Sequence, residues 1–498
     1  MGIDALLDMT SGAVPDRIAC GSRAAGRSFA ELARRAAGGA ALLAATGARH
    51  VGYPGVQGEA FPAAVYAAAA AGLPMTPLNY RLTDADLAEL IGRLDTPVVL
   101  ADRDQRHRVP AGVPVLTTGE WFVRAAETEP AGPPADPSEV AVMLFTSGTT
   151  ARPKAVVLRH EHLMAYVLGS AEFLSAGDDD CALVAVPPYH VAGIASVLSN
   201  VYAGRRVAYL SDFTPQGWLE TVRRERVTHA LVVPTMLARV VRHLDGAPAC
   251  VPELRSLAYG GAKVSASVLE AALAAFPATD FVNAYGLTET SSTIAVLGPA
   301  DHRAALASDD PVARQRLSSA GRPLPGVELS IRGEDGCEAG PGESGGLWVR
   351  GPQISGEYAG LGSALDKDGW FPTRDVAWID SGGCLFIEGR GDDTIVRGGE
   401  NVAPAEIEAV LDRHPGIAEV AVVGVPDEEW GQRTVAVVVS SDAGIPDAEA
   451  LRAWSRERLR SSRTPDEFVF RGSLPYTPTG KLLRRELVAE LAARATSS

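Results

Sequence analysis

The sequence predicts an α/β protein of two or three domains, and three observations support this fold class. The chain has 498 residues, which is too long for one compact core. Residues 1–320 alternate helix signals with short apolar strands, which indicates largely parallel sheets. Residues 321–390 instead carry short alternating strands, and a compact α+β pattern follows them.

The first part of the chain contains several strong helix and strand signals. Ser28 and Glu31 stand at capping-box spacing before an Ala/Leu-rich run, which predicts a helix. Thr83 is placed to cap a second helix, and the strand Val98–Ala101 follows it. Segment 226–244 reads as a strand leading into a helix, and segment 278–290 as a strand leading into a turn.

The last third of the chain shows a different pattern of predicted strands and helices. Segments 326–336, 345–353 and 382–390 alternate apolar and polar residues between Gly and Asp, which is typical of an antiparallel sheet or a small barrel. A Gly/Asp-rich joint at 389–399 precedes a predicted helix 403–415, strands 418–426 and 434–439, and a helix 447–460. These residues are enough for a small separate domain, and a tail follows its last predicted helix.

Composition excludes several functional classes. The net charge of −15 argues against a nucleic-acid partner. The five cysteines are scattered, which predicts reduced thiols, and the N-terminus lacks a secretory pattern. The apolar run 63–75 breaks at Gly72 and Pro74 and is too short to span a bilayer. We therefore expect a cytoplasmic protein without a membrane span.

A hydroxyl-rich loop follows the apolar strand 140–145 and is a candidate phosphate site. Hydroxyls, a flexible backbone and one cation suit an anion-binding turn, although the loop is not a Walker A motif. The alternative is an ordinary polar loop, which is commoner. The residues concerned are Thr146, Ser147, Gly148, Thr149, Thr150 and Lys154.

Later segments make the phosphate interpretation stronger. Tyr285 could stack on a base, Thr288 could bind phosphate and Glu289 could hold Mg²⁺, although Thr288–Glu289 also fits a helix cap. Asp375 and Arg390 offer an acid and a cation fifteen residues apart. A further lysine, at position 481 in "TPTGKLLRREL", stands on a Gly/Pro-flexible loop, where a lysine is normally only solvated.

Together these segments resemble the adenylate-forming superfamily of acyl-CoA synthetases, luciferases and peptide-synthetase adenylation domains. Five stretches carry the resemblance in the family's order: "LFTSGTTARPKAVVL", "PPYHVAGIAS", "AYGLTE", "IEGRGDDTIVRGGENVAPAEIE" and "TPTGKLLRREL". The resemblance implies an N-terminal domain, 1–390, of two packed α/β sheets and a barrel-like β subdomain. It also implies a small mobile C-terminal domain, 391–498, with its hinge near Asp392.

The resemblance implies a role for each matched residue. The hydroxyl-rich loop and Lys154 would face the pyrophosphate of ATP, and Thr288 the α-phosphate. Glu289 would hold Mg²⁺, while Asp375 and Arg390 would hold the ribose hydroxyls. Tyr285 would flank the adenine together with the small residues Gly260, Gly261 and Ala262.

The C-terminal segments have implied roles as well. Lys481 would bridge the attacking carboxylate and the α-phosphate, where one such contact can be worth roughly 10²–10³ in rate. Rotation of the small domain about Asp392 would separate adenylation from thioester formation. Gly398 and Gly399 would line the tunnel for the pantetheine of CoA.

His190 stands where related ligases place an aromatic or histidine gate at the acyl pocket, although a lone histidine is more often structural. Behind it, Val191, Gly193 and Ile194 are small or apolar and would leave room for a bulky hydrophobic acyl group. We find no acidic residue placed to hold an α-ammonium group, so a simple carboxylic acid is favoured over an amino acid.

The chain departs from the family's pattern at three positions. Ala151 and Ala155 replace glycines of the phosphate loop, and Arg374 replaces the glycine of the usual T-G-D. Arg374 could attract phosphate, or it could pair with Asp375 or Glu289 and fill the nucleotide pocket.

Three hypotheses of function follow. The first is a complete AMP-forming acyl-CoA ligase that uses ATP, Mg²⁺ and CoA, which Lys481, Glu289 and the hydroxyl loop favour. The second is a ligase that only joins preformed acyl-adenylate to CoA. The third is an adenylation enzyme that loads a separate carrier protein. The resemblance also suggests a homodimer.

Overall fold

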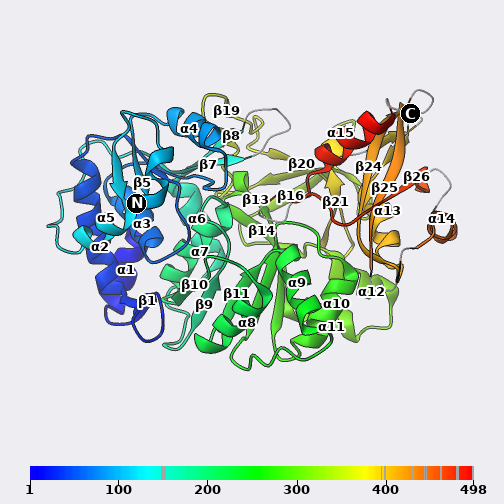
Figure 1. Cartoon of the computed structure of the whole chain (residues 1–498), viewed down its shortest axis with the longest axis horizontal. Helices are drawn as coiled ribbons and strands as arrows, with labels where there is room; N and C mark the ends of the chain where they lie inside the picture. The colour runs from blue at the N-terminus through cyan, green and yellow to red at the C-terminus, as the bar shows by residue number, and fades with distance from the viewer. Residues whose placement is uncertain are drawn as a thin grey trace.

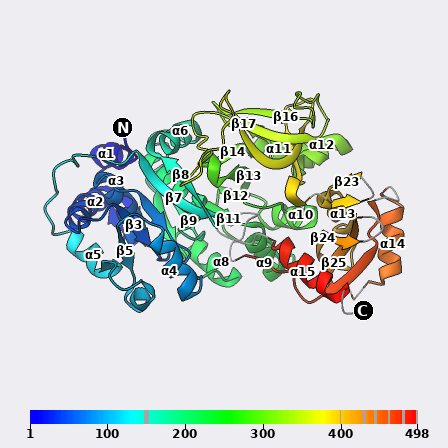
Figure 2. The same ribbon diagram turned by 90° about the horizontal axis from the view of Figure 1, so that it is seen from above.

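The computed structural model describes residues 1–146, 153–393, 395–397, 400–427, 431–441, 444, 446–459, 463–477 and 482–495. Two large sheets, one antiparallel sheet and a small C-terminal α+β unit make up the fold. Helices α1–α5 lie at one end of the molecule and the C-terminal elements at the other (Figures 1 and 2). The predicted fold class is confirmed.

The first large sheet has nine strands in the order β15-β14-β13-β12-β11-β9-β10-β1-β2. Its strands from β1 to β13 pair in parallel, and β2, β14 and β15 run antiparallel at the two edges. Their bounds are β1 Ile18–Cys20, β2 Arg27–Ser28, β9 Cys181–Val184, β10 Arg206–Tyr209, β11 His229–Val232, β12 Ser256–Gly260, β13 Asp280–Leu287, β14 Ser292–Leu297 and β15 Arg322–Pro323.

The second large sheet has eight strands in the order β19-β18-β8-β7-β4-β3-β5-β6. It is parallel from β7 to β6, and β8, β18 and β19 extend it in antiparallel pairs. The bounds are β3 His50–Tyr53, β4 Met75–Pro77, β5 Pro97–Ala101, β6 Val115–Thr117, β7 Val140–Thr146, β8 Lys154–Arg159, β18 Glu357–Tyr358 and β19 Gly362–Ser363.

Helices cover both sheets, and the largest core cluster joins α1, α2, α3, α6 and α7 to one face of the second sheet. A second cluster packs α8, α9 and α10 against the first sheet. The bounds are α1 Asp4–Ala13, α2 Phe29–Ala44, α3 Ala60–Ala70, α4 Asp84–Gly92, α5 Thr118–Ala125, α6 His160–Ser170, α7 Val191–Tyr202, α8 Pro215–Arg224, α9 Pro234–Leu244, α10 Ala266–Ala275, α11 Pro299–Ala307 and α12 Pro311–Gln315, with 3-10 turns η1 Arg103–Arg108, η2 Thr288–Thr290 and η3 Arg316–Ser318.

The caps predicted from the sequence are present. The Ser28 hydroxyl accepts a hydrogen bond from the Glu31 N–H at the start of α2, and Thr83 caps α4 in the same way. The Glu31 carboxylate pairs with Arg35 at 2.9 Å. The apolar run 63–75 begins within α3, whose side chains are almost all buried. Among the helices of the described residues, none combines the length and apolar character that a bilayer crossing needs.

The third sheet is the predicted antiparallel unit, with the order β16-β17-β20-β21 and its own core. Its strands are β16 Glu328–Arg332, β17 Gly345–Arg350, β20 Phe371–Ile379 and β21 Leu385–Arg390. The turn η4, Gly391–Asp393, contains Asp392 and follows β21 directly.

The C-terminal unit contains the predicted helices and strands, and four elements that the sequence did not reveal: β22, β23, β26 and α15. Strand β26 (Glu467–Arg471) pairs in parallel with β25, and helix α15 (Arg484–Ala495) packs beside β24. The other elements are β22 Ile395–Arg397, β23 Glu400–Val402, α13 Pro404–Leu411, β24 Ile417–Asp427, β25 Gly431–Ser440 and α14 Ala448–Arg456.

Candidate active site

The candidate site residues gather where parallel strands of the first sheet end. His190 follows β9, Gly261 follows β12, and Thr288 follows β13. Parallel strands place their carboxyl ends at one edge of a sheet, which is where α/β proteins bind ligands. The structure therefore brings three of the predicted segments to the same edge.

A buried carboxylate, Asp375, is the centre of the best-defined network. Its Oδ1 lies 2.9 Å from the Nε of Arg390, and its Oδ2 accepts a hydrogen bond from the Tyr285 hydroxyl. Asp375 is 4% exposed, and its N–H donates to the Thr373 hydroxyl at 3.1 Å. Burial and the neighbouring carboxylate raise the pKa of Tyr285 well above its usual value, so the phenol stays a donor.

A second group centres on Glu289. Its Oε1 accepts a hydrogen bond from the Tyr358 hydroxyl at 2.9 Å, and its backbone carbonyl accepts from Ser355 at 2.9 Å. The ammonium of Lys154 lies 5.3 Å from the centre of the Tyr358 ring. Burial, followed by the charge of Glu289, raises the pKa of Tyr358. One carboxylate fits Mg²⁺, which proteins usually bind together with substrate phosphates.

No cluster of three or more metal-binding side chains occurs within the described parts of the chain. Any Mg²⁺ at Glu289 would therefore depend on phosphate oxygens for most of its ligands. The Thr146 hydroxyl donates to the Lys154 carbonyl at 3.4 Å, which closes the ends of β7 and β8 on each other. Thr288 begins η2, which is a single 3-10 turn. The helix that the cap alternative requires therefore does not follow Thr288.

Several predicted residues lie outside the described residues. They are Ser147, Gly148, Thr149, Thr150, Ala151, Gly398, Gly399 and Lys481. Of the two alanines that replace family glycines, Ala155 is described, and it sits in β8 opposite Phe145. Because extended backbone suits any residue, this departure carries no conformational cost.

Arg374 is the departure with a visible cost. Its φ of +64° lies in the left-handed region, which costs a non-glycine residue about 1–2 kcal/mol. It forms no ion pair with Asp375, which Arg390 contacts, or with Glu289, which accepts from Tyr358. The alternative in which Arg374 forms an ion pair across the pocket is therefore wrong for this structure.

Gly260 has a packing role that the sequence did not predict. A Cβ on Gly260 would lie 2.2 Å from the Ala284 carbonyl oxygen, so this residue must be glycine for β12 and β13 to pair. Gly261, with φ of +86°, and Ala262 are exposed just beyond the strand. The predicted place of all three residues beside an adenine stays a prediction.

His190 stands at the N-cap of α7, and its ring lies 4.6 Å from the Tyr189 ring. Its Nε2 is buried and finds no hydrogen-bond partner among the described residues, so it is not a satisfied structural histidine. Burial lowers the pKa of His190 to about 4, which keeps the ring neutral at pH 7. Neutral imidazole next to an aromatic ring can form one wall of an acyl pocket.

The residues behind His190 pack more tightly than predicted. Ile194 is 0% exposed within the largest core cluster, so it supports the helix and does not line open space. A Cβ on Gly193 would lie 2.8 Å from the Pro187 carbonyl oxygen and 3.1 Å from Gln57 Nε2. Val191 is half-buried against the same core. Of these three residues, Val191 alone is not fully buried.

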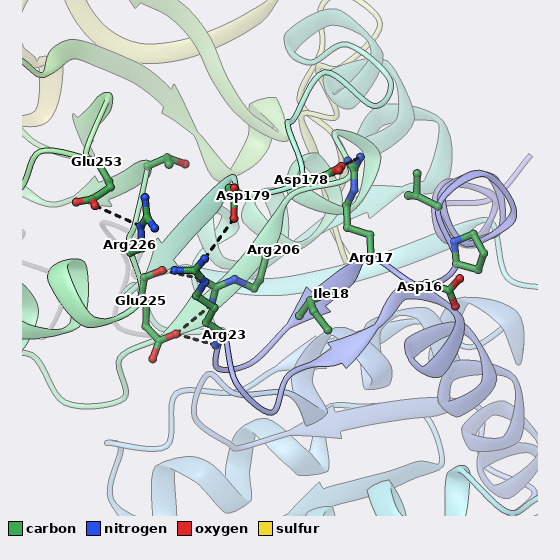
Figure 3. Close-up of a pocket in the computed structure, with 13 residues that line it drawn as sticks. Asp16, Arg17, Ile18, Arg23, Asp178, Asp179, Arg206, Glu225, Arg226 and Glu253 are labelled. Atoms are coloured by element: carbon green, nitrogen blue, oxygen red, sulfur yellow. Dashed lines mark hydrogen bonds and ion pairs between the residues drawn. The ribbon is translucent and has the colours of Figure 1, made fainter.

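A hollow of about 630 Å³ lies at the opposite edge of the first sheet, near the amino ends of its strands (Figure 3). Its charged side chains satisfy one another, as in the pairs Arg206–Glu225 at 3.1 Å and Arg226–Glu253 at 3.2 Å. None of the predicted site residues lines it.

The C-terminal unit touches the first sheet beside the candidate site. Arg242 of α9 lies 3.9 Å from Glu419. Burial lowers the pKa of Lys263, which the charges of Glu408 and Asp412 partly offset. Lys263 directly follows Ala262, so the contact between the units reaches the loop beside the site.

Two residues of the site had no useful signal in the sequence. Tyr358 reaches Glu289 and Lys154 because β18 pairs with β8, some two hundred residues earlier in the chain. Thr373 holds the backbone around Asp375 through its hydroxyl, which donates to the Leu347 carbonyl at 2.8 Å. An aromatic residue in a Gly-rich loop and a threonine in a strand are common and predict no role.

Comparison with known proteins identifies the family of the chain. The model of the AMP-binding enzyme family matches residues 7–359, and that of the AMP-binding enzyme C-terminal domain matches residues 406–481. The chain is 34% identical to a feruloyl-CoA synthase of Amycolatopsis sp over 472 residues, which cover 92% of this chain and 93% of the relative. It is 33% identical over 453 residues to the fatty acid–[acyl-carrier-protein] ligase ScoC of Streptomyces coeruleorubidus, which covers 88% of this chain and 86% of that relative.

A solved structure shows the same architecture with an intermediate bound. It is the o-succinylbenzoate CoA synthetase MenE of Bacillus subtilis in complex with the acyl-adenylate OSB-AMP. The TM-score is 0.83 at 28% identity, and the match covers 97% of both chains. The chain therefore belongs to the AMP-binding enzyme family, and the predicted class of adenylate-forming acyl-CoA synthetases is confirmed.

Proposed function

We propose that the protein is an AMP-forming acyl-CoA ligase that joins a bulky hydrophobic carboxylic acid to CoA through an acyl-adenylate. The observation that supports this best is the fixed carboxylate of Asp375, held between Tyr285 and Arg390 at the edge where Glu289 also lies. A carboxylate held in this way can accept hydrogen bonds from two neighbouring ribose hydroxyls. Glu289 can then hold Mg²⁺ on the phosphates.

The reaction would have two steps. A carboxylate oxygen of the acid attacks the α-phosphorus of ATP, and the bond to the leaving pyrophosphate breaks. The thiol of CoA then attacks the acyl carbon, AMP leaves with the anhydride oxygen, and the thiol proton passes to solvent. Lys154 would neutralise the pyrophosphate and Lys481 the charge developing at the α-phosphate.

The domain boundary at 390/391 and the hinge at Asp392 are part of this proposal. The turn that contains Asp392 directly follows Arg390, so a rotation there would move the C-terminal unit relative to the ribose-binding pair. Gly398 and Gly399 would admit the pantetheine arm of CoA after that rotation. A homodimer is also proposed, and light scattering of the purified protein would test it.

The identity of the acid is tested by pyrophosphate release with aromatic, branched and long-chain acids beside acetate. We expect activity with bulky apolar acids, in line with the relatives named for ferulate and fatty acids. Activity with acetate alone would refute the proposed substrate class. Thioester formation with free CoA, measured by mass spectrometry, would establish the acceptor.

Two other functions are candidates, and an experiment can distinguish each of them from the proposed one. The relative named as an acyl-carrier-protein ligase favours a carrier as acceptor, and acyl transfer to a carrier without transfer to CoA would decide for it. The replacement of the family's glycines by Ala151, Ala155 and Arg374 also fits a ligase that accepts only preformed acyl-adenylate. In that case Lys481→Ala would leave thioester formation from a synthetic acyl-adenylate intact, and wild type would not release pyrophosphate from ATP.

A further inference from the structure

Arg374 is the middle residue of a β-bulge in strand β20 of the third sheet. The pairing of β17 with β20 runs through Trp348↔Pro372 and resumes at Gly346↔Val376, so residues 373–375 stand opposite Leu347 alone. Extra residues of this kind bend a strand and re-aim its side chains, and they recur beside active sites. Here the bulge sends Thr373 and Asp375 inward and leaves Arg374 exposed.

The bulge holds Arg374 in the left-handed conformation described above, where glycine would be unstrained. The chain therefore has a long cationic side chain at a position whose backbone conformation favours glycine. Strain of this kind persists where the surrounding structure enforces it, and it clusters at functional sites.

Arg374 makes no hydrogen bond or ion pair with any residue in the described ranges, while the adjacent Asp375 is already paired with Arg390. The positive charges of Arg374 and Arg390 both act on the Tyr358 hydroxyl, which donates to Glu289. The ammonium of Lys154 lies over the ring of the same tyrosine.

We propose that Arg374 binds the phosphate chain of the nucleotide. The inference rests on the proposed function, because it places ATP against Asp375 and Glu289. Guanidinium is a planar fork of donors that matches phosphate oxygens, and such charge-assisted contacts are strong. Arg374 would therefore add a charge-assisted contact to the phosphates of the nucleotide.

Calorimetric titration of Arg374→Gly and Arg374→Gln with Mg·ATP and with adenosine tests the inference. The glycine variant removes both the strain and the charge, whereas the glutamine variant removes the charge and keeps the strain. We expect both to weaken Mg·ATP binding about 10-fold to 100-fold, with adenosine binding unchanged. The glycine variant should also unfold at an equal or higher temperature than wild type.

Arg226→Gly is the matched control. Arg226 also has a left-handed φ, of +50°, and is exposed, but it pairs with Glu253 at the far hollow. Its glycine variant relieves the same strain and should bind Mg·ATP like wild type.

The outcomes separate the two proposals. If wild type binds Mg·ATP and both Arg374 variants bind it equally well, the inference is overturned and the proposed function stands. Tighter binding by Arg374→Gly would show that the guanidinium obstructs the pocket, which also overturns the inference. If folded wild type binds no Mg·ATP, the proposed function and the inference fail together.

Discussion

The hydrogen bond from Tyr285 to Asp375 should contribute measurably to stability, and a double-mutant cycle can isolate it. Hydrogen bonds to charged groups are worth about 1.5–3 kcal/mol, and Asp375 is 4% exposed, so little water can replace the phenol. We therefore expect Tyr285→Phe to lower the free energy of unfolding by about 2 kcal/mol.

The same tyrosine should matter less once the charge is gone. In Asp375→Asn the amide oxygen still accepts from Tyr285, but a neutral hydrogen bond is worth only about 1 kcal/mol. Adding Tyr285→Phe to that variant should then cost about 1 kcal/mol, which gives a coupling free energy of about 1 kcal/mol. Arg390 is 37% exposed on its side chain, so solvent screens the pair and limits its share of the loss.

Denaturant unfolding of the four proteins at pH 7 measures the cycle. The comparison requires that all four show the same transition, because a change in the slope with denaturant would signal altered cooperativity. Losses that add to within about 0.3 kcal/mol would show that Tyr285 and Asp375 act independently and would refute the reasoning.

Three other perturbations have definite expected outcomes. Tyr358→Phe removes the donor on Glu289 and should raise the Mg²⁺ concentration needed for pyrophosphate exchange about 10-fold; an unchanged Mg²⁺ titration would contradict this. Because the neutral form of buried His190 is favoured, with a pKa near 4, the unfolded state binds more protons between pH 6.5 and about 4. Wild type should therefore lose up to about 3 kcal/mol of stability relative to His190→Asn as the pH falls through that range, measured by unfolding at several pH values. Asp412→Ala removes a negative charge that acts on Lys263 between the units and should speed proteolytic cleavage of the joint after residue 390; equal cleavage rates would show that this charge does not help to hold the units together.

Local chemistry explains which elements the sequence could predict. Ser28 and Thr83 cap their helices because a hydroxyl satisfies a free N–H wherever the helix lies, so no tertiary context is needed. Strand β26 was missed because its five residues mix charges with apolar side chains and pair only with β25. Helix α15 begins just after the lysine loop, and its polar sequence hides the face that packs beside β24.

The residues of the candidate site also fall into two groups: those that local sequence motifs identify and those that only the fold brings together. Tyr285, Glu289 and Asp375 were identified because they stand in local motifs. Tyr358 was missed because only the pairing of β18 with β8 brings it near Lys154. The packing role of Gly260 could not be predicted, because a missing Cβ can serve the neighbouring strand as well as a ligand, and only coordinates show the close approach of Ala284.

The order of strands in the first sheet also bears on how the chain is made. Strand β1 pairs in parallel with β10, so Cys20 must wait for Val207 to be synthesised. In the meantime the chain builds most of the second sheet, to which it returns only at β18. Contacts so distant in sequence form slowly, and an unpaired strand edge invites wrong partners. A nascent chain that has passed β8 but not β10 is therefore the form most in need of a chaperone on the ribosome.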